Sequence, residues 1–250
     1  MDFKNIILER KDGVAKIMIN RPEALNALDV ATLLEIQKAL EEIRNDESVG
    51  VVVLTGVGRA FSAGVDLKSV GGQRIEAGNV GADINAAARR VIQTMEELPK
   101  PVIAMVNGFC LTGGLEIAMG CDIIIASENS KFGDTHVRWG FRPTWGLSQK
   151  LPRAVGLMKA KELSFTAQMI SAAEAERIGL INKAVSPEEL EPTVLALAQS
   201  ILSNSRDAIA AYKSLMNHGF REDLAAALKF EAETSFNISD TEERVKQFRK

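Results

Sequence analysis

Two patterns of apolar residues alternate in the first half of the chain. Residues 49–55, 102–106 and 123–126 form nearly continuous apolar runs, each short enough for a strand that is covered on both faces. In residues 33–43 and 84–98, apolar side chains recur every three or four positions, as on one face of a helix. This order of strand, helix, strand, helix and strand predicts an α/β fold with parallel strands joined by crossover helices.

Turn and capping residues mark the ends of these elements. Lys11-Asp12-Gly13 separates two apolar segments near the N-terminus and predicts a hairpin. Asp29 is placed to cap the first helix, and Pro99 ends the second. Residues 71–81 hold four glycines and few apolar side chains, so we expect a mobile loop there.

Helical patterns dominate the last third of the chain. Residues 171–174 and 186–189 both match a capping box, in which a serine is followed three positions later by a glutamate. One short strand is expected in residues 180–185, and helices follow to the end. We therefore predict a core domain, residues 1–190, and a helical C-terminal region, residues 191–250.

Composition narrows the class of protein. Of the 250 residues, 46% are hydrophobic, which is enough to build a sizeable core. The net charge of −3 provides no overall positive field for nucleic acid. Cys110 and Cys121 lie in apolar surroundings, which indicates free thiols in a cytoplasmic protein. No apolar run approaches the roughly 20 residues of a membrane span, and we expect no signal peptide.

The strongest chemical signal is in residues 107–116, Asn-Gly-Phe-Cys-Leu-Thr-Gly-Gly-Leu-Glu. Glu116 lies just inside an apolar helix that opens on Gly113 and Gly114, and N–H groups at a helix N-terminus bind negative oxygen. An acid among apolar neighbours is costly to bury without a function. The segment therefore indicates an oxyanion-stabilising site beside a general base. The alternative is a structural buried acid that is paired with a cation.

A second turn, residues 61–67, also follows an apolar run, at the carboxyl end where open α/β sheets bind ligands. Gly64 permits close approach of another backbone or of a ligand. The N–H groups near Val65 and Gly113 could therefore converge on one oxygen and form an oxyanion hole. Alternatively, the segment is an ordinary tight turn in which Asp66 caps a helix.

Several motifs occur in order along nearly the whole chain. They comprise residues 20–22, 25–28, 61–67, 100–104, 107–116, 121–126, 132–133, 151–156 and 175–181. Together they resemble the crotonase (enoyl-CoA hydratase/isomerase) superfamily. The resemblance implies a spiral of ββα units with a C-terminal helical trimerisation region. It further implies an acyl-CoA thioester substrate, no separate cofactor or metal, and a homotrimer or a dimer of trimers.

The resemblance also assigns roles to residues of both turns. It implies that the thioester carbonyl oxygen lies between the N–H groups of Val65 and Gly113, next to Glu116. The residues expected along the bound substrate are Ala63, Gly64, Asp66, Leu67, Lys68, Gly114 and Trp145. The alternative for Lys68 is a solvated surface lysine.

One position departs from the family pattern. Hydratases of the family carry a second glutamate where this chain has His136, twenty residues after Glu116. Because histidine has an unperturbed pKa of about 6.5, it can give or take a proton at neutral pH. His136 is therefore a candidate catalytic group, and the alternative is that it only bonds to Asp134 or to a carbonyl. If this segment is extended, Asp134, His136 and Arg138 share one face.

Aromatic residues follow this position. Trp145, with Trp139 and Phe141 nearby, would add bulk beside the acyl group and shape its pocket. Alternatively, these three side chains belong to the core or to a subunit contact.

Three activities fit these residues. The favoured one is a lyase of fatty acid metabolism that hydrates a 2-trans-enoyl-CoA with Glu116 and His136. The second is an isomerase that moves a proton between the α and γ carbons with Glu116 as its single base. The third is a protein that binds CoA esters with little catalysis. The acyl-chain length stays open.

Overall fold

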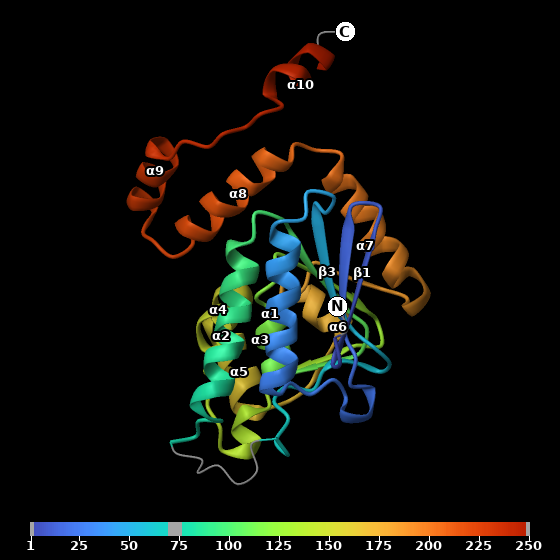
Figure 1. The fold of residues 1–250 in the computed structure, drawn as a ribbon. Coiled ribbons are helices and arrows are strands. Elements are labelled where there is room, and N and C mark those ends of the chain that lie inside the picture. The colour runs from blue at the N-terminus through green and yellow to red at the C-terminus, as the bar shows by residue number, and fades with distance from the viewer. Residues whose placement is uncertain (1–2, 70–76, 249–250) are drawn as a thin grey trace.

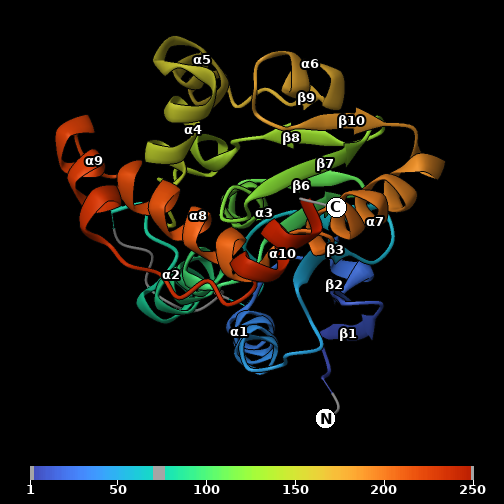
Figure 2. The same cartoon turned by 90° about the horizontal axis from the view of Figure 1, so that it is seen from above.

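The computed structural model describes residues 3–69 and 77–248. Its larger sheet has the strand order β1-β2-β3-β5-β7-β10, with β1 and β2 at one end and β10 at the other (Figure 2). The strands are β1 (Ile6–Lys11), β2 (Val14–Ile19), β3 (Val51–Gly56), β5 (Val102–Val106), β7 (Ile123–Ser127) and β10 (Lys183–Val185). β1 and β2 form the predicted antiparallel hairpin, and the remaining pairs are parallel. The parallel strands predicted from the apolar runs are thus confirmed.

A second, smaller sheet has the order β4-β6-β8-β9. Its strands are β4 (Ala60–Ser62), β6 (Phe109–Leu111), β8 (Lys131–Gly133) and β9 (Ile170–Ser171). β4, β6 and β8 run parallel, and β9 pairs with β8 in the antiparallel sense. Each of β4, β6 and β8 directly follows a strand of the larger sheet, so the chain alternates between the two sheets as it spirals. This arrangement is the repeated unit that the family resemblance implied.

Helices cover both faces of the larger sheet. The helices of the described residues are α1 (Val30–Arg44), α2 (Ala82–Glu97), α3 (Gly113–Ala118), α4 (Leu147–Val155), α5 (Leu157–Thr166), α6 (Ala172–Arg177), α7 (Pro187–Leu202), α8 (Arg206–Gly219), α9 (Leu224–Glu233) and α10 (Thr241–Phe248). The described residues also form the 3₁₀ turns η1 (Pro22–Ala24) and η2 (His136–Trp139). α1 and α2 lie side by side on one face, and α7 lies on the other (Figure 1).

The burial of β3 on both faces explains why its sequence is apolar throughout. Val52 and Leu54 join the cluster that contains α1 and α2, whereas Val51 and Val53 join the cluster that contains α7. Successive side chains of a strand point to opposite faces, so a sheet covered on both sides needs apolar residues at every position. Burial of each such side chain contributes about 1.5–3 kcal/mol.

The capping predictions have different outcomes. Asp29 caps α1, because its carboxylate accepts the Thr32 N–H at 2.7 Å. Ser171 caps α6 in the same way through the N–H of Glu174. The capping box at Ser186 is wrong: α7 does begin there, but the Ser186 hydroxyl donates to the Glu189 carboxylate and caps no backbone group.

The C-terminal helices extend beyond the sheets. α8 and α9 pack on each other at one end of the molecule, and α10 lies farther out (Figure 1). The boundary expected between residues 190 and 191 falls within α7, which packs on the larger sheet. The division into two domains stays a prediction. Among the helices of the described residues, none combines the length and the apolarity needed to cross a membrane.

The loop expected in residues 71–81 is described only in part. Residues 71–76 lie outside the described residues. Residues 77–81 lead into α2, and Arg142 donates its backbone N–H to the carbonyl of Gly78 at 3.1 Å. This contact ties the start of α2 to the segment that follows η2.

Candidate active site

Three turns lie at the carboxyl ends of neighbouring strands of the smaller sheet. Because β4, β6 and β8 are parallel neighbours, the turns that follow them lie side by side. These turns carry Val65, Gly113 and His136 respectively. The sequence predicted that the first two turns follow strands of the larger sheet at their carboxyl ends, which is the order that the structure has. A short strand of the second sheet lies between in each case and aligns the turns.

The first turn presents the N–H of Val65 away from its supporting segment. Leu28 donates its N–H to the carbonyl of Gly64 at 2.7 Å, and its carbonyl accepts the N–H of Asp66 at 2.8 Å. In a parallel bridge of this kind, the residue between the two bonded groups directs its own N–H to the other side. Within residues 3–69 and 77–248, the Val65 N–H has no acceptor.

The first and second turns are in contact. Gly64 has φ +95°, and a Cβ added to it would lie 3.1 Å from the nitrogen of Gly113 and would clash with the Thr112 hydroxyl. That hydroxyl donates to the carbonyl of Ala63 at 3.2 Å and ties the turns together. The Gly113 N–H likewise has no acceptor in the described part of the chain. Two unbonded N–H groups thus lie on adjacent turns, as an oxyanion hole requires.

Thr112 lies in the second turn, and neither its strained backbone nor its bonds to the other two turns were predicted from the sequence. It has φ +44° and ψ −115°, a conformation that residues other than glycine rarely adopt. Its N–H donates to the carbonyl of Gly133 at 2.9 Å, which links the second turn to the third. The sequence carries no signal for this strain, because a threonine between a strand and a helix is unremarkable locally.

Glu116 is held through one of its two carboxylate oxygens. It is 2% exposed, and Oε1 accepts the backbone N–H groups of Trp145 at 2.9 Å and Leu147 at 3.1 Å. Oε2 lies 3.6 Å from Nε2 of His136. Burial raises the pKa of Glu116, although the nearby His136 and the two N–H bonds act in the opposite direction. A buried carboxylate with one anchored and one free oxygen suits proton transfer.

His136 lies at the start of η2 and faces Glu116. Nδ1 is 2.7 Å from Oδ1 of Asp134, and both side chains are buried. The segment is not extended, so the condition for Asp134, His136 and Arg138 to share one face is not met: β8 ends at Gly133 and the chain turns into η2. As a result Arg138 points elsewhere and donates to the carbonyl of Ala167 at 2.6 Å. Asp134 and His136 remain paired because they are only two residues apart.

Of the three expected aromatic residues, Trp145 is the one that lies against the second turn. A Cβ added to Gly113 would lie 2.5 Å from its six-membered ring. Its indole N–H donates to Oδ1 of Asn85 at 2.7 Å, so the ring is fixed. Trp139 is 62% exposed and Phe141 packs on the core. Asn85 was missed, although a buried polar residue on the apolar face of α2 is a signal for such a contact.

The remaining predicted substrate residues have varied surroundings. Leu67 and Lys68 are exposed, next to the first turn. Asp66 accepts a hydrogen bond from Arg21 Nη2 at 2.8 Å and another from the Lys68 N–H, in a turn and not at a helix start. Gly114 packs against Ser62, so its lack of a side chain is explained by contact between α3 and β4.

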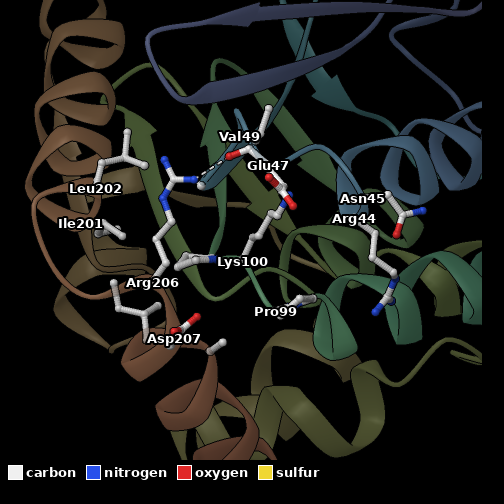
Figure 3. Close-up of a pocket in the computed structure, with 14 residues that line it drawn as sticks. Arg44, Asn45, Glu47, Val49, Pro99, Lys100, Ile201, Leu202, Arg206 and Asp207 are labelled. Carbon is white, nitrogen blue, oxygen red and sulfur yellow. Dashed lines mark hydrogen bonds between the residues drawn. The ribbon is translucent and has the colours of Figure 1, made fainter. Parts of the chain in front are cut away.

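A cavity of about 430 Å³ lies away from these turns, between the end of α1 and the start of α8 (Figure 3). Its cations are bonded to main-chain carbonyls. Lys100 donates to the carbonyls of Ile43 and Asp46, and Arg206 donates to that of Glu47 at 2.7 Å. These bonds close the C-terminal end of α1 and join it to α8, which is a structural role.

Comparisons with known proteins identify related sequences and structures. A family model described as enoyl-CoA hydratase/isomerase matches residues 9–249. The chain is 45% identical to a short-chain-enoyl-CoA hydratase of Clostridium acetobutylicum, over 98% of this chain and 93% of the relative. It is 44% identical to a crotonyl-CoA hydratase of Syntrophomonas wolfei, over 93% and 89%. An enoyl-CoA hydratase structure from Bacillus anthracis superposes with a TM-score of 0.91 at 34% identity, covering 98% and 96%.

Proposed function

Because the chain belongs to the enoyl-CoA hydratase/isomerase family, we propose that it is an enoyl-CoA hydratase, a lyase that adds water across the 2,3 double bond of an enoyl-CoA thioester. The observation that carries this choice is the 3.6 Å approach of Glu116 Oε2 to His136 Nε2. Hydration needs one group to deprotonate water and another to protonate the α carbon, whereas isomerisation needs only one base. The names of the two relatives at 44–45% identity support the same choice.

In the proposed mechanism, the N–H groups of Val65 and Gly113 bind the thioester oxygen. The Glu116 carboxylate takes a proton from water as the water oxygen bonds to the β carbon. The π electrons move to the thioester oxygen and give an enolate, which the two N–H groups stabilise. The enolate then takes a proton at the α carbon from Nε2 of His136. Transfer of a proton from Glu116 to His136 restores the starting state.

The substrate supplies the only CoA group in this scheme, so no separate cofactor takes part. We propose that Ala63, Leu67 and Lys68 lie along the CoA portion, because they border the first turn and the latter two are exposed. Trp145 lies against Gly113 and would border the acyl group close to the reacting carbons. We also propose a cytoplasmic location, since Cys110 and Cys121 are free thiols.

Two substrates test the reaction class. Purified protein mixed with crotonyl-CoA should remove the absorbance of the conjugated thioester as the 3-hydroxyacyl product forms. A 3-enoyl-CoA should give no rise in that absorbance. If the absorbance changes only with the 3-enoyl substrate, and rises, the protein is an isomerase. If it changes with neither substrate, the remaining hypothesis is a protein that binds CoA esters with little catalysis.

The pH dependence of hydration should report on Glu116. Burial raises the pKa of this carboxyl above its ordinary value of 4.5, and only the ionised form accepts a proton from water. Activity is therefore expected to fall as the pH decreases through the raised pKa of Glu116, which lies above 4.5. Above that pKa the carboxyl is ionised and can accept the proton. The measurement is kcat/KM for crotonyl-CoA between pH 4 and 9. An acidic limb at or below 4.5 would contradict a raised pKa.

The exposed face of α8 supports the proposed homotrimer or dimer of trimers. Tyr212, Met216 and Phe220 follow one another at four-residue spacing, and they are 64%, 65% and 66% exposed. They border a cavity of about 1240 Å³ between α8 and the core. An apolar stripe of this kind is typical of a subunit contact.

A charge on this stripe should break the assembly. We expect the unmodified protein to be a trimer or hexamer by light scattering, and the Met216→Glu variant to shift toward the monomer because a carboxylate is costly to bury. Ser214→Glu, on the opposite side of α8, is the matched control and should leave the mass unchanged. A monomeric parent protein would refute the proposed assembly.

A further inference from the structure

We propose that Asp134 is a positioning residue for this reaction, which fixes the ring of His136 so that Nε2 faces Glu116 and carries the proton destined for the α carbon. The inference rests on the proposed hydration and extends it to a residue outside the pair that handles the protons. It follows from the geometry of the third turn.

Asp134 holds His136 at two points. Its Oδ1 lies 2.7 Å from Nδ1 of the ring and also accepts the backbone N–H of His136 at 3.3 Å. Asp134 is 4% exposed and comes directly after β8, so its own position is set by the smaller sheet. The ring is therefore held on one side by Asp134 and presents Nε2 on the opposite side, toward Glu116.

The chemistry of a carboxylate decides which ring nitrogen carries the proton. An ionised aspartate only accepts hydrogen bonds, so the Nδ1 that contacts Asp134 must be protonated. Burial alone would raise the pKa of Asp134, but hydrogen bonds from His136 and Ser164 hold it below the ordinary value of 3.8. With Nδ1 occupied, every proton that the ring gains or loses is exchanged at Nε2.

The charges around the ring fit this exchange. A protonated His136 lies between the carboxylates of Asp134 and Glu116, at 2.7 and 3.6 Å. Ser164 of α5 and the N–H groups of Trp145 and Leu147 complete the polar surroundings of the three side chains. When the ring gives its proton to the α carbon, Glu116 has just gained one from water, so the total charge of the site stays constant. Asp134 keeps its charge throughout.

Asp134→Asn tests the role in a double-mutant cycle. The amide can donate to Nδ1 and so favour a proton on Nε2 of the neutral ring, which leaves that nitrogen unable to recover the proton from Glu116. We expect kcat for crotonyl-CoA to fall by about 10- to 100-fold, with KM changed by less than about threefold. In a His136→Gln background, which has no titrating ring, the same substitution should have almost no further effect. An equal loss in both backgrounds would show a merely structural residue and overturn the proposal.

A second measurement, by NMR of the histidine rings, depends neither on an activity assay nor on a variant of Asp134. The chain contains only two histidines, so His218→Gln assigns the ring signals in ¹⁵N-histidine-labelled protein. His218 stacks on Phe230, in the α8–α9 pair, and its replacement should leave hydration unchanged. In the neutral form of the ring, the unmodified protein should show the single proton of His136 on Nδ1. Protonation at Nε2 would overturn the proposal, whereas a failure to hydrate crotonyl-CoA would instead refute the proposed function.

Discussion

Glu116→Gln is expected to lower kcat for the hydration of crotonyl-CoA by about 10³- to 10⁴-fold, because the amide cannot take a proton from water. The amide has the same shape, and its oxygen can still accept the N–H groups of Trp145 and Leu147. The backbone around the site should therefore stay in place. The rate is measured from the absorbance of the conjugated thioester, and KM should change much less than kcat.

The same variant should be at least as stable as the parent protein. Burial raises the pKa of Glu116, which means that the folded protein holds the ionised carboxyl less favourably than the unfolded chain does. At neutral pH the ionised group therefore opposes folding, and a neutral isostere removes that effect. An unchanged or higher Tm together with lost activity would identify Glu116 as a functional acid, because groups that are required for activity commonly lower the stability of the folded protein.

Asp122 is a matched control for a buried acid with a structural role. Burial raises its pKa too, but Asp122 Oδ2 contacts Lys213 at 2.7 Å and accepts the N–H of Val102. Asp122→Asn should leave kcat near that of the parent, because this carboxyl contacts Lys213 and Val102 and lies outside the three turns of the site. If Glu116→Gln behaved like Asp122→Asn, Glu116 would be a structural acid and the proposed mechanism would fail.

The comparison of sequence and structure shows which features local patterns can predict. Apolar runs located β3, β5 and β7, because a strand covered on both faces must be apolar at every position. β4, β6 and β8 have three residues each, which is too short for any periodicity. Only the resemblance to a known family implied them, and they are the strands that align the three turns of the site.

Long-range contacts limited what the sequence could say about the site. Glu116 was predicted from its apolar helix that opens on two glycines, and His136 from its place in the family pattern, twenty residues later. The anchoring of Glu116 by N–H groups at the start of α4 was not predicted, because it depends on how α4 docks against α3. The strain at Thr112 and the contact of Asn85 with Trp145 were missed for the same reason.

Gly64→Ala should produce the second largest loss, about 10²- to 10³-fold in kcat, which is the effect of losing one oxyanion donor. The added Cβ would clash with the Thr112 hydroxyl and would lie 3.1 Å from the nitrogen of Gly113. The two turns must therefore move apart, and the N–H groups of Val65 and Gly113 can no longer point at one oxygen. The substitution also places alanine at φ +95°, at a cost of about 1–3 kcal/mol in stability.

Gly156→Ala separates the loss of the oxyanion hole from the loss of stability. Gly156 has φ +81° and lies between α4 and α5, and its added Cβ would meet no atom within 4 Å among the described residues apart from its own chain neighbours. Both variants carry the backbone cost of a positive φ, so both should lower Tm, but only Gly64→Ala should lower kcat. Equal kcat in the two variants, measured well below either Tm, would mean that the spacing of the two turns does not control the reaction. A loss confined to Gly64→Ala would instead assign the enolate oxygen to the place where these turns meet.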